Sequence, residues 1–224
     1  MKNRIFIVIV FALLGGMSLL ISCSENLSRT NPLDPLNPIN TGSGGTEVPI
    51  NINSNNPSFE TWSGGISFTN PTSDGNMLSD MWQAAWGGGG LPCNVVREGI
   101  LKTDGSYSLK VTMSGSGVSA TSWGIFTKYA GYTAYIGKRI RLKADVYCSV
   151  ANKASLVLTY YNDRHNPVIS SYATNANAWT PLSVDSVVPA DAINLQIHFG
   201  GYAPPANNEV YIFDNVKLYE VTAP

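Results

Sequence analysis

The sequence predicts an all-β domain built as a sandwich of two antiparallel sheets. Its clearest strand signal runs from Ile140 to Val150, where apolar residues alternate with charged and polar ones. A pattern of period two is typical of a strand that buries one face. Turn signals such as Asp104-Gly105 separate this run from others like it. About eight or more short strands in roughly 170 residues, with no long helical periodicity, are typical of such a sandwich.

The composition supports this fold class and argues against a nucleic-acid-binding protein. The 224 residues include 21 Gly and 13 Pro, which suit a turn-rich β domain, and charged residues make up only 13%, against about 25% in typical domains. The formal net charge is −1. A nucleic-acid-binding protein needs a basic surface that displaces counterions from phosphate. We therefore expect no nucleic acid among the partners of this chain.

Residues 1–22 have the pattern of an export signal. Lys2 and Arg4 precede an apolar run from Ile5 to Leu20. A run of this length behind basic residues is typical of a secretory signal peptide rather than of a membrane-spanning helix. The protein is therefore expected to be exported.

The end of this signal, Leu20-Ile21-Ser22-Cys23, resembles the lipobox of bacterial lipoproteins. In that family a peptidase cuts before the cysteine, and acyl chains are added to its sulfur and its new amine. The resemblance implies that Cys23 is a lipidated membrane anchor in the cell envelope, at the outer membrane or the cell surface. Several acyl chains hold a protein on a membrane far better than one. The alternative is a plain signal peptide followed by an incidental cysteine.

Residues 23–55 are expected to be the lipidated cysteine and a flexible tether. Three X-Pro pairs between Asn31 and Pro38 are followed by a Gly-Ser stretch at 42–45, and large apolar residues are few. Each proline biases its predecessor away from helix, and Gly-Ser stretches behave as flexible coils. The tether would hold the folded domain, residues 56–224, clear of the membrane surface.

Further strands are expected throughout that domain. In the run 192–199, apolar residues alternate with Asn194, Gln196 and His198. The other stretches of strand character are 58–62, 81–86, 95–98, 107–113, 122–127, 155–161, 168–172, 179–187 and 209–219. The residues that we expect in the core include Phe59, Trp82, Leu109, Val111, Trp179 and Phe213.

Four segments together resemble a known fold. They are Asn56-Pro57-Ser58-Phe59-Glu60-Thr61-Trp62, Asp80-Met81-Trp82, Gly105-Ser106-Tyr107-Ser108-Leu109-Lys110-Val111 and Tyr211-Ile212-Phe213-Asp214-Asn215-Val216-Lys217-Leu218. In this order they resemble the galactose-binding-like β-jelly-roll, especially the carbohydrate-binding modules of bacterial polysaccharide-degrading enzymes. The resemblance covers roughly Asn56 to Val221 and implies a jelly roll. It does not determine the ligand, because one fold serves many functions.

The resemblance also implies a metal site. In many relatives a carboxylate on the first strand and one on the last help to hold a structural Ca²⁺, and the matching residues here are Glu60 and Asp214. Backbone carbonyls around Asp104 to Ser106 would add oxygen ligands, which calcium prefers. The alternative is that both carboxylates accept hydrogen bonds from loop amides.

A carbohydrate site is expected on the polar face of the run 192–199. Sugars need flat aromatic surfaces for their C–H faces and planar amide or imidazole groups for their hydroxyls. If that face is concave, it presents both kinds of group. The expected ligand-binding residues are Asn194, Gln196 and His198, with Tyr147, Tyr161 and Trp123 from other strands.

Catalysis has little support in the sequence. The two histidines are not spaced as in typical zinc sites, and no nucleophile-elbow or phosphate-binding glycine motif is present. Gln196-Ile197-His198 resembles the short Gln-Ile-His motif of a family of alginate lyases, which are also β-jelly-rolls. The Arg-rich strand and the late Tyr-Phe-Lys motif of that family are missing here. We therefore expect a protein that is not an enzyme.

Two features are left open by the sequence. The cationic stretch 138–143 fits a solvated strand face, but Arg141 and Lys143 would also suit an acidic polysaccharide. Cys93 and Cys148 would be exported to an oxidising compartment, and the sequence does not decide whether they pair.

The expected function is non-catalytic binding of a polysaccharide or oligosaccharide by a membrane-anchored lipoprotein. The membrane contact would be through the lipid anchor only. One alternative is a protein–protein adhesion or envelope-assembly module on the same fold, with a protein partner in the envelope. Another is a polysaccharide lyase.

Overall fold

The computed structural model describes residues 45–52, 58–62, 67–69, 77–79, 82–85, 93–114, 122–160, 169–202 and 206–222. The chain divides into two compact units, residues 1–41 and 42–224. All described residues belong to the second unit. The expected signal peptide, Cys23 and most of the expected tether therefore lie outside the described residues.

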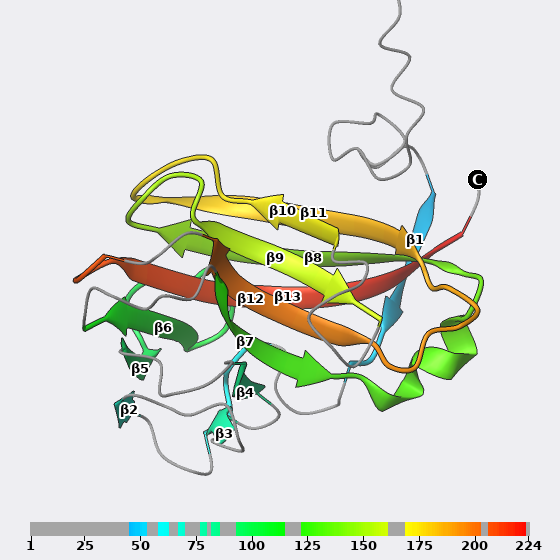
Figure 1. Ribbon diagram of the computed structural model, residues 1–224, viewed down its shortest axis with the longest axis horizontal. Coiled ribbons are helices and arrows are strands. Elements are labelled where there is room, and N and C mark those ends of the chain that lie inside the picture. Colours follow the sequence, from blue (N-terminus) through cyan, green and yellow to red (C-terminus); the bar gives the residue numbers. More distant parts are fainter. Residues whose placement is uncertain are drawn as a thin grey trace, which may run out of the picture. The chain divides into compact units, whose positions relative to one another are not determined.

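Two antiparallel sheets hold all strands of the described residues, as Figure 1 shows. In the 7-stranded sheet the order is β11 (Ala178–Val187), β8 (Arg139–Cys148), β13 (Val210–Thr222), β6 (Ser108–Met113), β5 (Cys93–Glu98) and β2 (Ser67–Thr69), and β1 (Thr46–Ile50) also pairs with β13. In the 6-stranded sheet the order is β10 (Ile169–Tyr172), β9 (Ala154–Thr159), β12 (Gln196–Tyr202), β7 (Ser122–Lys128), β4 (Trp82–Ala85) and β3 (Met77–Ser79). The predicted all-β sandwich of jelly-roll type is confirmed.

The core lies between the two sheets and is built by the alternation that the sequence predicts. On β8, the even-numbered residues from Ile140 to Cys148 are buried, and most of the odd-numbered ones are half-buried. Ile197 and Phe199 of β12 are 0% exposed. Phe199 stacks on Phe213 of the other sheet with ring centroids 4.7 Å apart, and Trp82 lies 5.1 Å from Phe199. The Phe199–Phe213 contact joins the two sheets, and Trp82 packs beside it from the same sheet as Phe199.

The predicted core is confirmed at every position except one. Phe59, Trp82, Leu109, Val111 and Phe213 are all 0% exposed. Trp179, by contrast, is half-buried and lies at an outward position of β11. Its register partner is Tyr147 of β8, an outward residue as well, so strand parity directs the Trp179 ring away from the core.

The folded unit starts earlier than expected. Residues 46–50, which we assigned to the tether, form β1 and pair with β13 from Thr46↔Thr222 to Ile50↔Leu218. Ile50 and Ile52 are 5% and 3% exposed, so they belong to the core. Pro49 is tolerated because β1 pairs on one side only within the described residues, and an edge strand does not need every N–H group.

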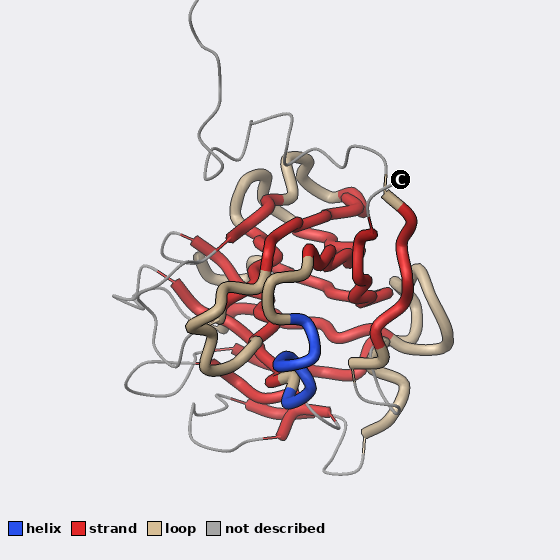
Figure 2. Tube along the Cα trace, turned by 90° about the vertical axis from the view of Figure 1, so that its right-hand side faces the viewer, coloured by secondary structure: helices blue, strands red, loops and turns tan. Residues whose placement is uncertain are grey.

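Two other segments differ from their predicted structure. Residues 58–62 form a turn rather than a strand, and Phe59 has a positive φ of 61°. Burial of its ring between Trp82 and Phe199 outweighs the backbone strain. The described part of the chain also includes one short 3-10 helix, η1 (Ala130–Tyr135). Figure 2 shows this helix at one end of the sandwich.

No helix among the described residues has the length and hydropathy that a membrane span requires.

Cys93 and Cys148 do not form a disulfide. Both are free and buried. They lie on β5 and β8, and β6 and β13 separate these strands in the sheet. With neighbouring strands about 4.8 Å apart, the two cysteines are about 14 Å from each other across the sheet. A disulfide requires Cα atoms within about 7 Å.

Candidate functional site

The Gln196–His198 pair lies at the centre of the 6-stranded sheet. Both residues belong to β12, which pairs with β9 on one side and β7 on the other. Their neighbours Ile197 and Phe199 are core residues, so strand parity places Gln196 and His198 on the outer face. The His198 Nε2 and Gln196 Oε1 atoms lie 2.8 Å apart, within hydrogen-bond distance. The sequence prediction of polar outward residues on this strand is confirmed.

The side chains around this pair are largely shielded from solvent. On β9, Thr159 lies opposite Gln196, and Val157 lies opposite His198. Gln196 and Thr159 are each 7% exposed and Val157 is 8% exposed. His198 is half-buried. Of these four side chains, the imidazole of His198 is therefore the most accessible to solvent. The amide of Gln196, the hydroxyl of Thr159 and the aliphatic side chain of Val157 are its neighbours.

The outward residues of β9 were not predicted as part of this site. All six residues of β9 are buried, although only alternate ones face the core. A strand that is buried on both faces reads as an almost continuous apolar run, and the stretch Ser155-Leu156-Val157-Leu158-Thr159 has that character. The sequence therefore indicated that this strand is buried, but it did not indicate a binding site.

The other predicted ligand-binding residues are only partly brought to this pair. Asn194 lies two residues before β12 and is half-buried, and its backbone N–H donates to the carbonyl oxygen of Tyr160. Trp123 lies on β7 opposite Gly201, but its side chain is outside the described residues. Tyr161 lies outside the described residues as well.

Tyr147 does not join the Gln196–His198 pair. It belongs to β8 of the 7-stranded sheet, and its position on that strand faces away from the core. The sequence pattern identified Tyr147 as an outward residue but did not show which sheet its strand belongs to. The expected convergence of Tyr147 with His198 is therefore wrong.

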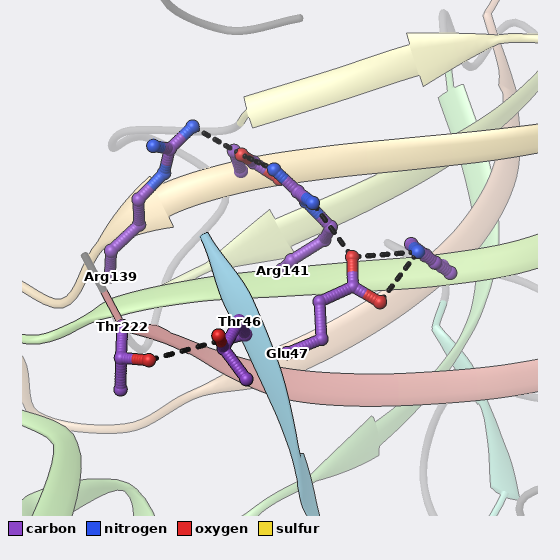
Figure 3. Close-up of polar contacts among 7 residues, drawn as sticks. Thr46, Glu47, Arg139, Arg141 and Thr222 are labelled. Carbon is purple, nitrogen blue, oxygen red and sulfur yellow. Dashed lines mark hydrogen bonds and ion pairs between the residues drawn. The ribbon is translucent and has the colours of Figure 1, made fainter. Parts of the chain in front are cut away.

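The cationic stretch on β8 is neutralised by acidic partners. Arg141 is 7% exposed, and its Nε and Nη2 atoms donate to Asp185 of β11 at 2.5 Å and 2.7 Å. Its Nη1 atom donates to Glu47 of β1 at 2.7 Å. Lys143 also donates to Glu47, and Arg139 donates to Asp185. Figure 3 shows Glu47 reaching from β1 toward Arg141. These contacts favour the structural interpretation of the stretch over a site for an acidic polymer.

Ion pairing shifts two ionisation equilibria in this cluster. Hydrogen bonds from Lys143 and Arg141 hold the pKa of Glu47 below its ordinary value, because they stabilise the carboxylate. The hydrogen bonds that Arg141 donates to Asp185 raise the pKa of Arg141. Glu47 and Arg141 are therefore both charged at neutral pH.

Glu60 and Asp214, the predicted calcium ligands, bind the same loop. Asp214 is 0% exposed, and its Oδ2 atom accepts hydrogen bonds from the backbone N–H groups of Thr103 and Asp104 at 2.6 Å and 3.0 Å. The Oε1 atom of Glu60 accepts from the N–H groups of Ser106 and Tyr107 at 2.9 Å and 3.1 Å.

These contacts do not fit a cation at the same two oxygen atoms, because N–H hydrogens point at them. Burial raises the pKa of Asp214, although several amide donors act in the opposite direction. No group of three His, Cys, Asp or Glu side chains that could hold a metal occurs among the described residues. The contacts favour the hydrogen-bonding alternative, and calcium binding stays a prediction from the resemblance.

Comparisons with known proteins concern the fold. No protein-family model matches the chain, and no curated protein matches it in sequence. Among solved structures, it is similar to the enzymatically active domain of tailspike protein 4 of bacteriophage CBA120, with a TM-score of 0.50, 14% identity and coverage of 69% of this chain and 21% of that chain.

Carbohydrate-binding modules are also among the similar structures. One is a family 16 carbohydrate-binding module, with a TM-score of 0.41, 17% identity and coverage of 55% of this chain and 84% of that chain. Another is the Clostridium thermocellum endo-1,4-β-D-xylanase 10B, a CBM22–GH10 protein complexed with xylohexaose, with a TM-score of 0.47, 18% identity and coverage of 69% and 28%. These are similarities of fold alone.

Proposed function

We propose that the domain binds a polysaccharide without cleaving it. The observation that carries this proposal is the Gln196–His198 pair, in which a half-buried imidazole lies 2.8 Å from a buried amide on the outer face of a sheet. A buried amide that holds an imidazole in place produces a preorganised hydrogen-bonding surface. Sugar hydroxyls both donate and accept hydrogen bonds, so they match such a surface.

The absence of catalysis is part of the proposal. Lyases and hydrolases need a base and an acid placed on both sides of the bond that breaks. Among the described residues, the carboxylates of Glu60, Asp185 and Asp214 already accept hydrogen bonds from loop amides or arginines.

We further propose that Cys23 carries lipid and holds the domain at the cell envelope. Support comes from the apolar run that ends in Leu20-Ile21-Ser22-Cys23. Labelled palmitate should enter the wild-type chain and not the Cys23→Ser variant, and the variant should leave the membrane fraction. Labelling that persists in Cys23→Ser would exclude this anchor.

The binding proposal is tested with the full-length chain in detergent. Affinity electrophoresis through gels that contain soluble xylan, β-1,4-galactan or alginate should show retardation by at least one polymer. The His198→Ala and Gln196→Ala variants should bind that polymer about tenfold more weakly, because each loses a hydrogen-bonding group from the site. Ser183→Ala is the matched control, since Ser183 is an exposed strand residue on the other sheet.

Three results would contradict the proposal. The first is a wild-type chain that no polymer retards, and the second is a His198→Ala variant that binds as tightly as Ser183→Ala. The third is cleavage of alginate or another uronate polymer, measured by absorbance of the unsaturated product, that is lost in His198→Ala. This third result would establish a lyase.

A further inference from the structure

Tyr147 and Trp179 form an aromatic pair on the outer face of the 7-stranded sheet. They lie opposite each other in the register of β8 and β11. Their ring centroids are 6.0 Å apart with an interplanar angle of 64°, a T-shaped arrangement. Both residues are half-buried. In a T-shaped pair one ring packs its edge on the other, so the two rings present surfaces of different orientation to solvent.

The pair is one end of a short strip that crosses three strands. Ile212 of β13 lies opposite Tyr147 in register and is 0% exposed. It is not part of the core cluster between the sheets, so it fills the outer face beside the rings. Beside the pair, the Tyr147 hydroxyl donates to Asn177 Oδ1 at 3.4 Å. Asn177 is exposed and lies in the turn before β11 with a φ of 54°.

This strip is too small for a stable interface with another protein. Three neighbouring strands span about 10 Å, whereas a stable protein interface covers about 800 Å² on each partner. Polar groups border the strip. Lys110 of β6 is the register partner of Ile212 and forms an ion pair with Glu98. Asp145, two residues before Tyr147, accepts a hydrogen bond from Asn215. The apolar surface is therefore of the scale of one or two sugar rings.

We propose that Tyr147, Trp179 and Asn177 form a second carbohydrate contact. The rings would stack on the C–H face of a sugar, and the Asn177 amide and Tyr147 hydroxyl would bind its hydroxyls. This inference rests on the proposed function, since it extends carbohydrate binding to another face. The contact lies on the outer face of one sheet and the Gln196–His198 pair on the outer face of the other, so the two point in opposite directions.

The geometry gives the domain two places to hold a polymer. Because the sheets are packed face to face about 10 Å apart, a straight glycan segment cannot touch both outer faces. Each face would therefore hold its own segment, of the same polymer or of a neighbouring one. Two weak contacts on one polymer raise the overall affinity through effective concentration, provided that the chain can reach both.

The test uses the full-length chain in detergent and the panel polysaccharide that retards the wild type most. Trp179→Ala combined with Tyr147→Ala should weaken binding about five- to tenfold, because each lost ring removes stacking. Trp179→Leu keeps an apolar side chain at this position and should weaken binding while leaving the melting temperature within a few degrees. Tyr219→Ala is the matched control, since it removes a half-buried tyrosine ring of the same sheet that lies outside the strip and has Lys143 5.2 Å from its centroid.

The outcomes separate the second contact from the proposed function. Residual binding by His198→Ala/Gln196→Ala that disappears when Trp179→Leu is added supports two contacts. Equal binding by Trp179→Leu, Tyr219→Ala and the wild type overturns the second contact and leaves the proposed function intact. If no polymer retards the wild type, the proposed function fails and the second contact fails with it. If the double alanine variant unfolds, the Trp179→Leu result decides.

Discussion

Asp214 holds a loop to the last strand through several donors to a single buried carboxylate. Beside Thr103 and Asp104 at Oδ2, the backbone N–H of Asn215 donates to its Oδ1 atom at 2.8 Å. In Asp214→Ala these three N–H groups would lose their acceptor at the edge of a fully buried position, so we expect the free energy of unfolding to fall by about 3 kcal/mol. Urea denaturation measures it. Ser106→Ala, at an exposed position of the same loop whose printed contact is made by the backbone N–H, should change it by less than about 0.5 kcal/mol.

A chelator distinguishes the two interpretations of Glu60 and Asp214. If hydrogen bonds alone hold the loop, EDTA leaves the melting temperature of the wild type unchanged, and added calcium does not raise it. We expect this result, because N–H groups already face the Oδ2 and Oε1 atoms. A melting temperature that falls in EDTA and recovers with excess Ca²⁺ would instead establish a bound ion, since a ligand of the native state stabilises it.

Individual residues were predictable where strand parity decides their place. The inward Phe213 and the outward His198 follow directly from alternation on strands of clear period. Phe59 was correctly expected in the core, but not its positive φ, which depends on the rings that surround it. Trp179 shows the limit of composition-based reasoning. A large aromatic residue is usually buried, yet its register with Tyr147 places it outside.

Among the strands, β1 is attached to the sheet by side chains as well as by backbone pairing. Glu47 bonds to Arg141 and Lys143 on β8, beyond the intervening β13. In Glu47→Gln, Arg141 keeps Asp185 as its partner, so we expect a modest loss of about 1 kcal/mol at neutral pH. Thermal unfolding at low ionic strength measures it, and high salt should reduce the difference between variant and wild type.

The same substitution changes the response to acid. The pKa of Glu47 is lower in the folded chain than its ordinary value of 4.5. Its contribution to stability is therefore present above pH 4.5 and is lost as the pH falls through the lowered pKa. The melting temperature of Glu47→Gln should approach that of the wild type below this range. A difference that stays constant from neutral pH down to about pH 2 would show that packing, not charge, is responsible.

Strands with strong alternation were predicted nearly to the residue, whereas β1 was missed. The predicted run 140–150 corresponds to β8, and all but the first residue of 209–219 belong to β13. The stretch 46–50 contains Pro49 and follows a Gly-Ser segment, both of which predict irregular structure. Its strand forms because β13 offers a long partner on that side. Such long-range pairing leaves no local signature in the sequence.

At the scale of the whole molecule, the sandwich was predictable but the grouping of strands into sheets was not. Alternation shows which residues of a strand share a face, and it does not show which strands are neighbours. Tyr147 and His198 were grouped because both face outward. The sheet order places them on opposite sides of the sandwich. This strand order separates Tyr147 from His198 and places Tyr147 opposite Trp179.

The closure of the two sheets over one core also determines the chemistry of the thiols. Cys93 and Cys148 are both 0% exposed. Burial raises the pKa of Cys93 to about 12 and raises that of Cys148 as well. Because the thiolate is the reactive form, neither thiol should react with Ellman's reagent in the native domain. Both should react once the chain is unfolded in guanidinium.

If no disulfide supports the fold, dithiothreitol should leave the melting temperature unchanged. A Cys148→Ala variant should lose stability, because a buried side chain at the inner face of β8 is shortened. It should also leave Cys93 as unreactive as before. A fall of the melting temperature on reduction of the wild type, absent in Cys148→Ala, would show that the two cysteines pair after all. That result would require β5 and β8 to be neighbours, and it would overturn the sheet order on which both proposed carbohydrate contacts depend.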